Sequence, residues 1–129
     1  MDQEINNKQP KAETSDVSQI GDLKKIDVSY VDSAENKVYL MLMCVGYIDG
    51  SPEIQAALLD KMEGYIGHIL SDWFKQEYKG LSPVTVVCFQ EVPHQLILQL
   101  LTKCIVWFGD YGIELRFKIK DSYFKINEN

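Results

Sequence analysis

Cysteine and histidine are scarce in this chain, and their arrangement excludes several kinds of site. Among 129 residues there are two histidines and three cysteines, and no two cysteines have the CxxC spacing. An odd number of cysteines, each inside an apolar run, is typical of neither a disulfide framework nor a zinc site. We interpret Cys44, Cys88 and Cys104 as buried thiols that act as small apolar side chains, which favours a reducing compartment. His68 and Asp72 could hold a metal only with further ligands that the sequence does not offer, so we expect no metal and no cofactor.

Long apolar runs and basic residues are also few. No segment reaches the roughly 18 uninterrupted apolar residues that a membrane span needs, and the polar N-terminus lacks the apolar region of a secretory signal. We therefore expect a cytoplasmic protein with no membrane partner. With 13 basic against 19 acidic residues, the formal net charge is −6. Sequence-independent binding of nucleic acid rests on phosphate neutralisation by Lys and Arg, so this balance argues against nucleic acid and favours a basic protein partner.

The motifs of common enzyme classes are missing as well. The chain has no phosphate-binding glycine loop, no nucleophile elbow and no HExxH zinc motif. Gly64-Tyr-Ile-Gly67 has the GxxG spacing of RNA-binding loops, but it lies in the apolar stripe of a predicted helix without basic neighbours. We attribute these glycines to close helix packing. The sequence thus predicts a protein that is not an enzyme.

The most informative segment present is Lys37–Ile48, which predicts a strand with apolar side chains on both faces. Such a strand must be covered from two sides and belongs in the middle of a sheet. Val84–Phe89 has the same character, whereas Ile26–Tyr30 and Ile113–Lys120 alternate apolar and polar residues as half-buried strands do. We place the two alternating strands at or near the sheet edges.

Two amphipathic helices separate these strands. The first is predicted to run from Ser51-Pro52-Glu53 to about Tyr78, and the second from Pro93 to about Phe108. The resulting order is ββαβαβ, an α+β two-layer sandwich with a four-stranded mixed sheet and two helices on one face. Residues 1–24 are too polar to offset the entropy cost of ordering, which predicts a flexible leader before a single α/β domain at 25–129.

One face of this sheet has no helix to cover it. Tyr39, Met41 and Met43 share a face of the first doubly apolar strand, and we add Val87 and Phe89, or their alternates, from the second. This apolar area would exceed the few hundred Å² that monomers usually expose. We therefore predict an interface here, with a second copy in a homodimer or with a protein partner, unless the chain termini fold over it.

Polar residues gather where the predicted parallel strands end. Ligands of α/β sheets bind at the carboxyl ends of strands, and this edge carries Asp49, Ser51, Glu91 and His94. An acid, a hydroxyl and an imidazole could together form a ligand-binding or general acid–base site. The same residue types also cap helices, so the second interpretation is that Ser51 caps the first helix while Glu91 and His94 begin the next.

Several short segments carry a resemblance to a known family. They are Ile26-Asp27-Val28, Lys37-Val38 with Leu40, Leu58-Leu59, Lys61-Met62, Tyr65-Ile66 and Gly112–Phe117. Over roughly residues 25–120 the chain resembles an uncharacterised family of small bacterial α/β domains, catalogued as a domain of unknown function. The resemblance implies a fold and no catalytic residues.

Two hypotheses about function follow from the sequence. The first is a non-catalytic cytosolic interaction module that self-associates or binds a protein, for instance an acidic immunity or accessory protein that neutralises a basic effector. The alternative is a small-molecule-binding domain or minor enzyme that uses the strand-end loops around Asp49 and His94.

Overall fold

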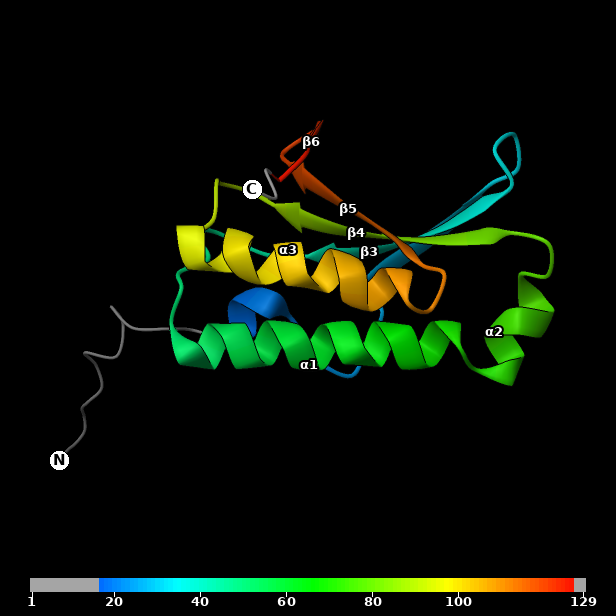
Figure 1. Ribbon diagram of the computed structural model, residues 1–129, viewed down its shortest axis with the longest axis horizontal. Helices are drawn as coiled ribbons and strands as arrows, with labels where there is room; N and C mark the ends of the chain where they lie inside the picture. The colour runs from blue at the N-terminus through cyan, green and yellow to red at the C-terminus, as the bar shows by residue number, and fades with distance from the viewer. Residues whose placement is uncertain (1–16, 127–129) are drawn as a thin grey trace, which may run out of the picture.

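A computed structural model of the protein describes residues 17–126 and has two layers, a twisted sheet and a layer of helices beneath it (Figure 1). The strands are β2 (Val28–Asp32), β3 (Lys37–Met43), β4 (Ser82–Phe89), β5 (Glu114–Ile119) and β6 (Ser122–Phe124). The helices are α1 (Pro52–Ile69), α2 (Asp72–Glu77) and α3 (Gln95–Gly109), preceded by a 3₁₀ turn, η2 (Val17–Ile20).

The sheet has the order β2-β3-β4-β5-β6. The central pairs β3–β4 and β4–β5 are parallel, whereas β2–β3 and β5–β6 are antiparallel. Because α1 and α3 connect the parallel strands, both helices run in the same direction on one side of the sheet (Figure 1). The α+β class and the mixed sheet are therefore confirmed, but the predicted number of four strands and the order ββαβαβ are wrong.

The fifth strand comes from the C-terminal segment. Ser122–Phe124 pairs with β5 after a tight turn, in which Lys120 takes a left-handed φ of 56° and its N–H donates to the carbonyl of Phe89 (2.8 Å). The ring of Phe124 packs on Phe117 with centroids 5.9 Å apart. A segment of three residues between charged neighbours is too short to show the alternation that predicts a strand. In the structure, the packing of Phe124 holds β6 in place.

The single helix that the sequence predicted up to about Tyr78 is instead two helices, α1 and α2. Ser71 has an extended backbone (φ −69°, ψ 153°), and its Oγ accepts a hydrogen bond from the N–H of Phe74 (3.2 Å), which caps α2. Because the helix is interrupted at Ser71, the side chains of α2 that face the core do not continue the spacing of those on α1. Phe74 of α2 is buried, whereas the neighbouring Trp73 is 58% exposed.

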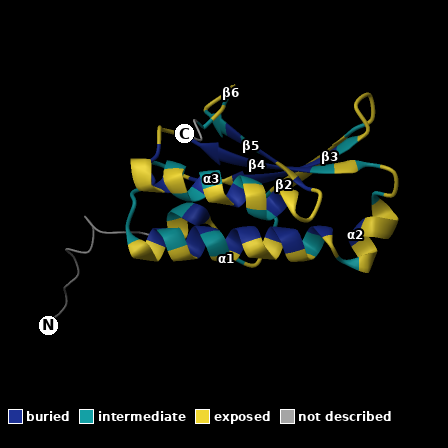
Figure 2. Cartoon of the chain, in the orientation of Figure 1, coloured by how far each residue is buried: buried dark blue, intermediate teal, exposed yellow. Residues whose placement is uncertain are grey.

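The doubly apolar strands are covered as such strands must be. On β3, Val38, Leu40 and Leu42 are fully buried against the helices, together with Val87 and Phe89 of β4. Figure 2 shows this buried layer running through the strands and along the sheet-facing side of α1. The alternate side chains form a smaller cluster on the opposite face of the sheet, made of Tyr39, Met41, Val84, Val86 and Cys88.

Part of the predicted leader packs on the domain. Ile20, at the end of η2, is fully buried in the helix-side core, and the side-chain amide of Gln19 donates to the carbonyls of Val45 (2.9 Å) and Tyr47 (3.0 Å). The packed domain therefore includes residues before 25. Residues 1–16 of the predicted leader lie outside the described residues.

None of the helices in the described part of the chain combines the length and the apolar character that crossing a membrane would require.

Candidate functional site

The structure brings the two strand-end loops of the predicted ligand site together. The N–H of His94 donates to the carbonyl of Ile48 (2.9 Å), which joins the loop after β4 to the loop after β3. Between them lies Gly50, where an added Cβ would be 2.7 Å from the Nδ1 of His94 and 2.9 Å from the Cβ of Leu96. The two loops are therefore in direct contact, which leaves no room for a ligand between them at this point.

The polar groups of these loops are used for local structure. Ser51 Oγ accepts a hydrogen bond from the N–H of Ile54 (3.3 Å) and caps α1, and His94 Nδ1 accepts one from the N–H of Leu96 (3.0 Å) and caps α3. Asp49 Oδ1 accepts from the N–H of Ser51 (3.0 Å). These acceptors are thus occupied by backbone donors. Glu91, the remaining residue of the predicted site, is exposed. A ligand site formed by these four residues therefore stays a prediction.

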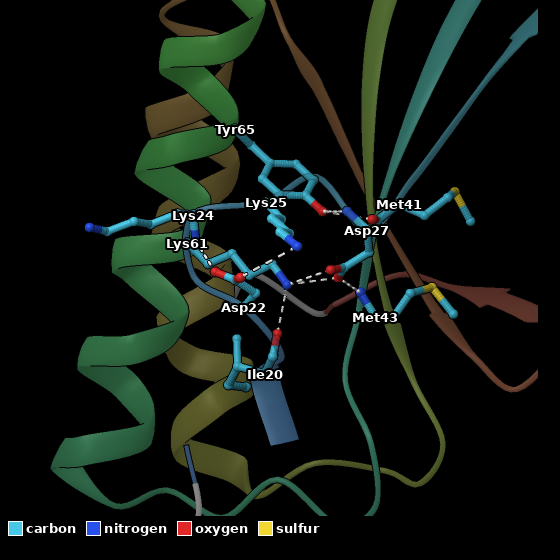
Figure 3. Close-up of polar contacts among 9 residues, drawn as sticks. All are labelled: Ile20, Asp22, Lys24, Lys25, Asp27, Met41, Met43, Lys61 and Tyr65. Atoms are coloured by element: carbon cyan, nitrogen blue, oxygen red, sulfur yellow. Dashed lines mark hydrogen bonds and ion pairs between the residues drawn. The ribbon is translucent and has the colours of Figure 1, made fainter. Parts of the chain in front are cut away.

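The strongest polar cluster lies elsewhere, around a buried lysine of α1 (Figure 3). Lys61 is fully buried, and its Nζ donates to both carboxylate oxygens of Asp27 (2.7 and 2.8 Å) and to the carbonyl of Ile20 (2.7 Å). An ammonium group has three protons, so its donors are matched by three acceptors. The second oxygen of Asp27 also accepts from the N–H of Met43 (2.8 Å).

Tyr65, one helical turn after Lys61, extends this cluster. Its hydroxyl donates to the carbonyl of Met41 (2.7 Å) and accepts from the N–H of Asp27 (3.0 Å), and burial raises its pKa. The nearby thiol of Cys44 is also desolvated, which raises its pKa to about 12 and keeps it neutral. Because Lys61, Asp27 and Tyr65 all have partners within the fold, their role is to fasten the segment before β2 to α1 and to the end of β3.

His68 and Asp72 lie at the α1–α2 junction. The imidazole of His68 packs against the rings of Trp73 (5.6 Å between centroids) and Phe74 (5.4 Å). No group of three or more metal-binding side chains occurs within residues 17–126.

The structure places only some of the predicted interface residues on the open face of the sheet. Tyr39, Met41 and Met43 do lie on this face, beside Val86 and Cys88, which are the alternates of the residues that we had placed there. Val87 and Phe89 instead belong to the helix-side core and are 0% and 2% exposed. The side-chain alternation of β4 therefore has the opposite phase to the one that the prediction named first.

Side chains of the sheet itself cover much of this face. The guanidinium of Arg116 lies over the rings of Tyr39 (5.5 Å) and Tyr123 (5.8 Å), donates to the hydroxyl of Tyr39 (3.2 Å) and pairs with Glu114 (2.6 Å). On the other side, Tyr30 stacks on Tyr39 with centroids 4.9 Å apart. This layer explains why Tyr39 is only 4% exposed although α1 and α3 lie on the opposite face of the sheet.

The helix layer offers a more open surface. Where α1 and α3 run side by side (Figure 1), a shallow hollow of about 820 Å³ opens between them. Its apolar lining comes from three segments of the chain, namely from Leu23 before β2, from Ala56, Ala57 and Leu59 of α1, and from Trp107 of α3. Its apolar lining is open to solvent and could take a few apolar side chains of a ligand.

Two carboxylates border this hollow, from Asp60 and Glu63 of α1. Both residues are exposed, and neither forms an ion pair or side-chain hydrogen bond with another described residue. The hollow thus combines an apolar floor with unpaired negative charge at its rim, and we call it the α1–α3 hollow.

No protein-family model matches this chain, and it matches neither a curated protein sequence nor a solved structure. The sequence reasoning missed both the buried ion pair and the α1–α3 hollow. The sequence did contain an indication of the ion pair, because Lys61 lies in the apolar stripe between Leu58 and Tyr65, where a lysine needs a buried partner. The sequence contained no indication of the hollow, because the position of Trp107 relative to α1 depends on tertiary packing.

Proposed function

We propose that this protein is a non-catalytic interaction module that binds a basic, amphipathic segment of a protein partner in the α1–α3 hollow. The observation that carries the proposal is the combination of an apolar floor with the carboxylates of Asp60 and Glu63, which pair with no residue between 17 and 126. It supports the version of the first hypothesis in which an acidic accessory or immunity protein neutralises a basic effector.

The shape and charge of the hollow favour a helical segment as ligand. Amphipathic helices bind by placing their apolar face in a groove between helices, with charged residues of the ligand at the rim. Trp107 and Leu59 provide the apolar contact, and tryptophan is enriched among the residues that dominate binding energy. The net charge of −6 adds a long-range attraction that raises the rate of encounter with a basic partner at low salt.

The state of the thiols supports a cytoplasmic setting for this function. Cys44, Cys88 and Cys104 are free and buried. Burial raises the pKa of each thiol, to about 12 for Cys44 and about 11 for Cys104, so all three stay protonated at neutral pH. A protein with three inert, reduced thiols suits a reducing compartment.

Two designed helical peptides test the proposal, one of leucine and lysine and one of leucine and glutamate with the same apolar face. Binding is measured by the fluorescence of Trp107 in a Trp73→Phe background, which leaves one tryptophan. We expect the lysine peptide to bind and the glutamate peptide to bind at least about tenfold more weakly, since each exposed ion pair contributes up to about 1 kcal/mol.

A charge-reversed variant identifies the site. Asp60→Lys with Glu63→Lys should weaken the lysine peptide about tenfold or more and strengthen the glutamate peptide. The matched control is Glu77→Lys, an exposed carboxylate of α2 outside the hollow, which should change neither affinity by more than about twofold. Equal binding of both peptides, or equal effects of the reversal and of the control, would contradict the proposal.

A further inference from the structure

The two edges of the sheet differ in how well they are protected from pairing with another strand. β6 is three residues long and has Lys120, Asp121 and Lys125 as neighbours, which are features that blunt an edge. β2 has five residues and contains no lysine, arginine or proline. Its large apolar side chains are exposed on both faces, at 48% for Val28 and 44% for Val31. An edge of this kind is a template for a further strand.

The backbone of β2 has unused hydrogen-bonding groups on its outer side. The N–H of Met43 donates to Asp27, on the β2 side of β3, while the N–H of Cys44 donates to β4. Odd-numbered residues of β3 therefore point their backbone groups toward β2. Since β2 pairs Val28 with Met41 and Tyr30 with Tyr39, its even-numbered residues bond to β3.

It follows that Ser29 and Val31 direct their N–H and C=O groups away from the sheet. Within the described part of the chain no donor or acceptor is bonded to them there. These groups are the ones that an added strand would satisfy.

We propose that β2 pairs with β2 of a second copy of this chain, antiparallel and about a two-fold axis midway between the two facing Tyr30 residues, to form one continuous sheet. A two-fold axis normal to the sheet keeps each face on the same side, so one residue must lie directly opposite its own copy, with the axis midway between them. With the axis at Tyr30, Ser29 lies opposite Val31 of the second copy, and all the outward backbone groups of both strands are paired. With the axis at Ser29, Val31 would lie opposite Asp27, whose N–H already donates to the hydroxyl of Tyr65 (3.0 Å).

The side chains favour the same register and a second copy as the partner. Tyr30 would lie opposite Tyr30 of the second copy in a non-hydrogen-bonded pair, where side chains are closest, and would extend the existing stack of Tyr30 on Tyr39. Asp32, the last residue of β2, would lie opposite Val28 of the second copy, so no like charges face each other within the paired strands.

This pairing goes beyond the proposed function, because it uses an edge strand outside the α1–α3 hollow. The test is the molar mass of the full chain by light scattering and sedimentation over a wide range of concentration. We expect the wild type to reach twice the monomer mass. Tyr30→Lys should raise the dissociation constant about tenfold or more, because it removes the stack and places like charges directly opposite each other. The matched control, Tyr123→Lys on the short edge strand β6, should leave it unchanged.

A disulfide cross-link tests the register and does not depend on the fold of the Tyr30→Lys variant. Tyr30→Cys should form a disulfide-linked dimer on mild oxidation, because residues directly opposite each other in a non-hydrogen-bonded pair are close enough for a disulfide, whereas Tyr123→Cys on β6 should not. A wild type that stays monomeric at every concentration would overturn the inference. So would a dimer that is equally weakened by Tyr30→Lys and Tyr123→Lys, or one in which Tyr30→Cys forms no disulfide between the two copies. Each of these results would leave peptide binding by the α1–α3 hollow unaffected, so the two proposals can fail independently of each other.

Discussion

Replacing Lys61 by methionine should be among the most destabilising single changes in this protein. Methionine preserves most of the apolar stem but removes the ammonium, so the carboxylate of Asp27 loses its charge partner and the carbonyl of Ile20 loses its donor. Removing one partner of a buried ion pair typically costs about 3–5 kcal/mol. The side chain of Asp27 is 19% exposed and can recover some hydration, so we expect a loss of about 3 kcal/mol in the free energy of unfolding.

The double variant separates the ion pair from general damage to the core. Lys61→Met with Asp27→Asn leaves no unpaired charge, and an asparagine oxygen can still accept from the N–H of Met43. We therefore expect the double variant to be more stable than the sum of the single losses predicts, with a coupling of about 2 kcal/mol.

Urea unfolding followed by far-UV circular dichroism measures these free energies. Lys75→Met, at an exposed position of α2, is the control and should change stability by less than about 0.5 kcal/mol. The reasoning is refuted if Lys61→Met unfolds within that same margin of the wild type, or if the two single losses simply add.

Three further predictions follow from the loops and from the buried thiol. Because burial raises the pKa of Cys44 from 9.0 to about 12, its neutral thiol stabilises the fold fully below pH 9, and this contribution is lost as pH rises toward 12. Stability should therefore fall above pH 9, and Cys44→Ala should make that fall shallower in urea titrations at stepped pH; an unchanged slope would disprove this cause. Gly50→Ala should lower the melting temperature, since its Cβ would lie 2.7 Å from His94, and a melting temperature equal to the wild type would show that the loops can separate at little cost. Ser51→Ala should cost about 1 kcal/mol through loss of the α1 cap, whereas Ser82→Ala at an exposed position should cost almost nothing in the same urea assay.

The parts of the fold that follow from local pattern were predictable from the sequence. The doubly apolar character of Lys37–Ile48 and Val84–Phe89 placed both strands inside the sheet, although β3 ends at Met43. The caps at Ser51 and His94 were among the interpretations that the sequence left open. These features depend on residues that are close in the sequence. Periodicity and capping chemistry therefore carry most of the information needed.

The parts that depend on distant contacts were not predictable. Ser122–Phe124 becomes a strand because Phe124 finds Phe117, and Val87 faces the helices because strand pairing fixes its phase. The partner of Lys61 lies 34 residues earlier in the chain. A stripe position occupied by lysine indicates that a buried partner exists, but only the tertiary structure identifies it as Asp27.

The α1–α3 hollow carries the functional proposal, and residue-resolved mapping of a bound peptide tests it most directly. Backbone amide shifts of the full chain are recorded by NMR during titration with the leucine–lysine peptide. The account predicts that the largest changes lie at residues 56–63 of α1 and at Trp107, around the apolar floor and its two carboxylates. Changes centred instead on Asp49–Ser51 and Glu91–His94 would contradict it and would favour the strand-end loops as the binding site.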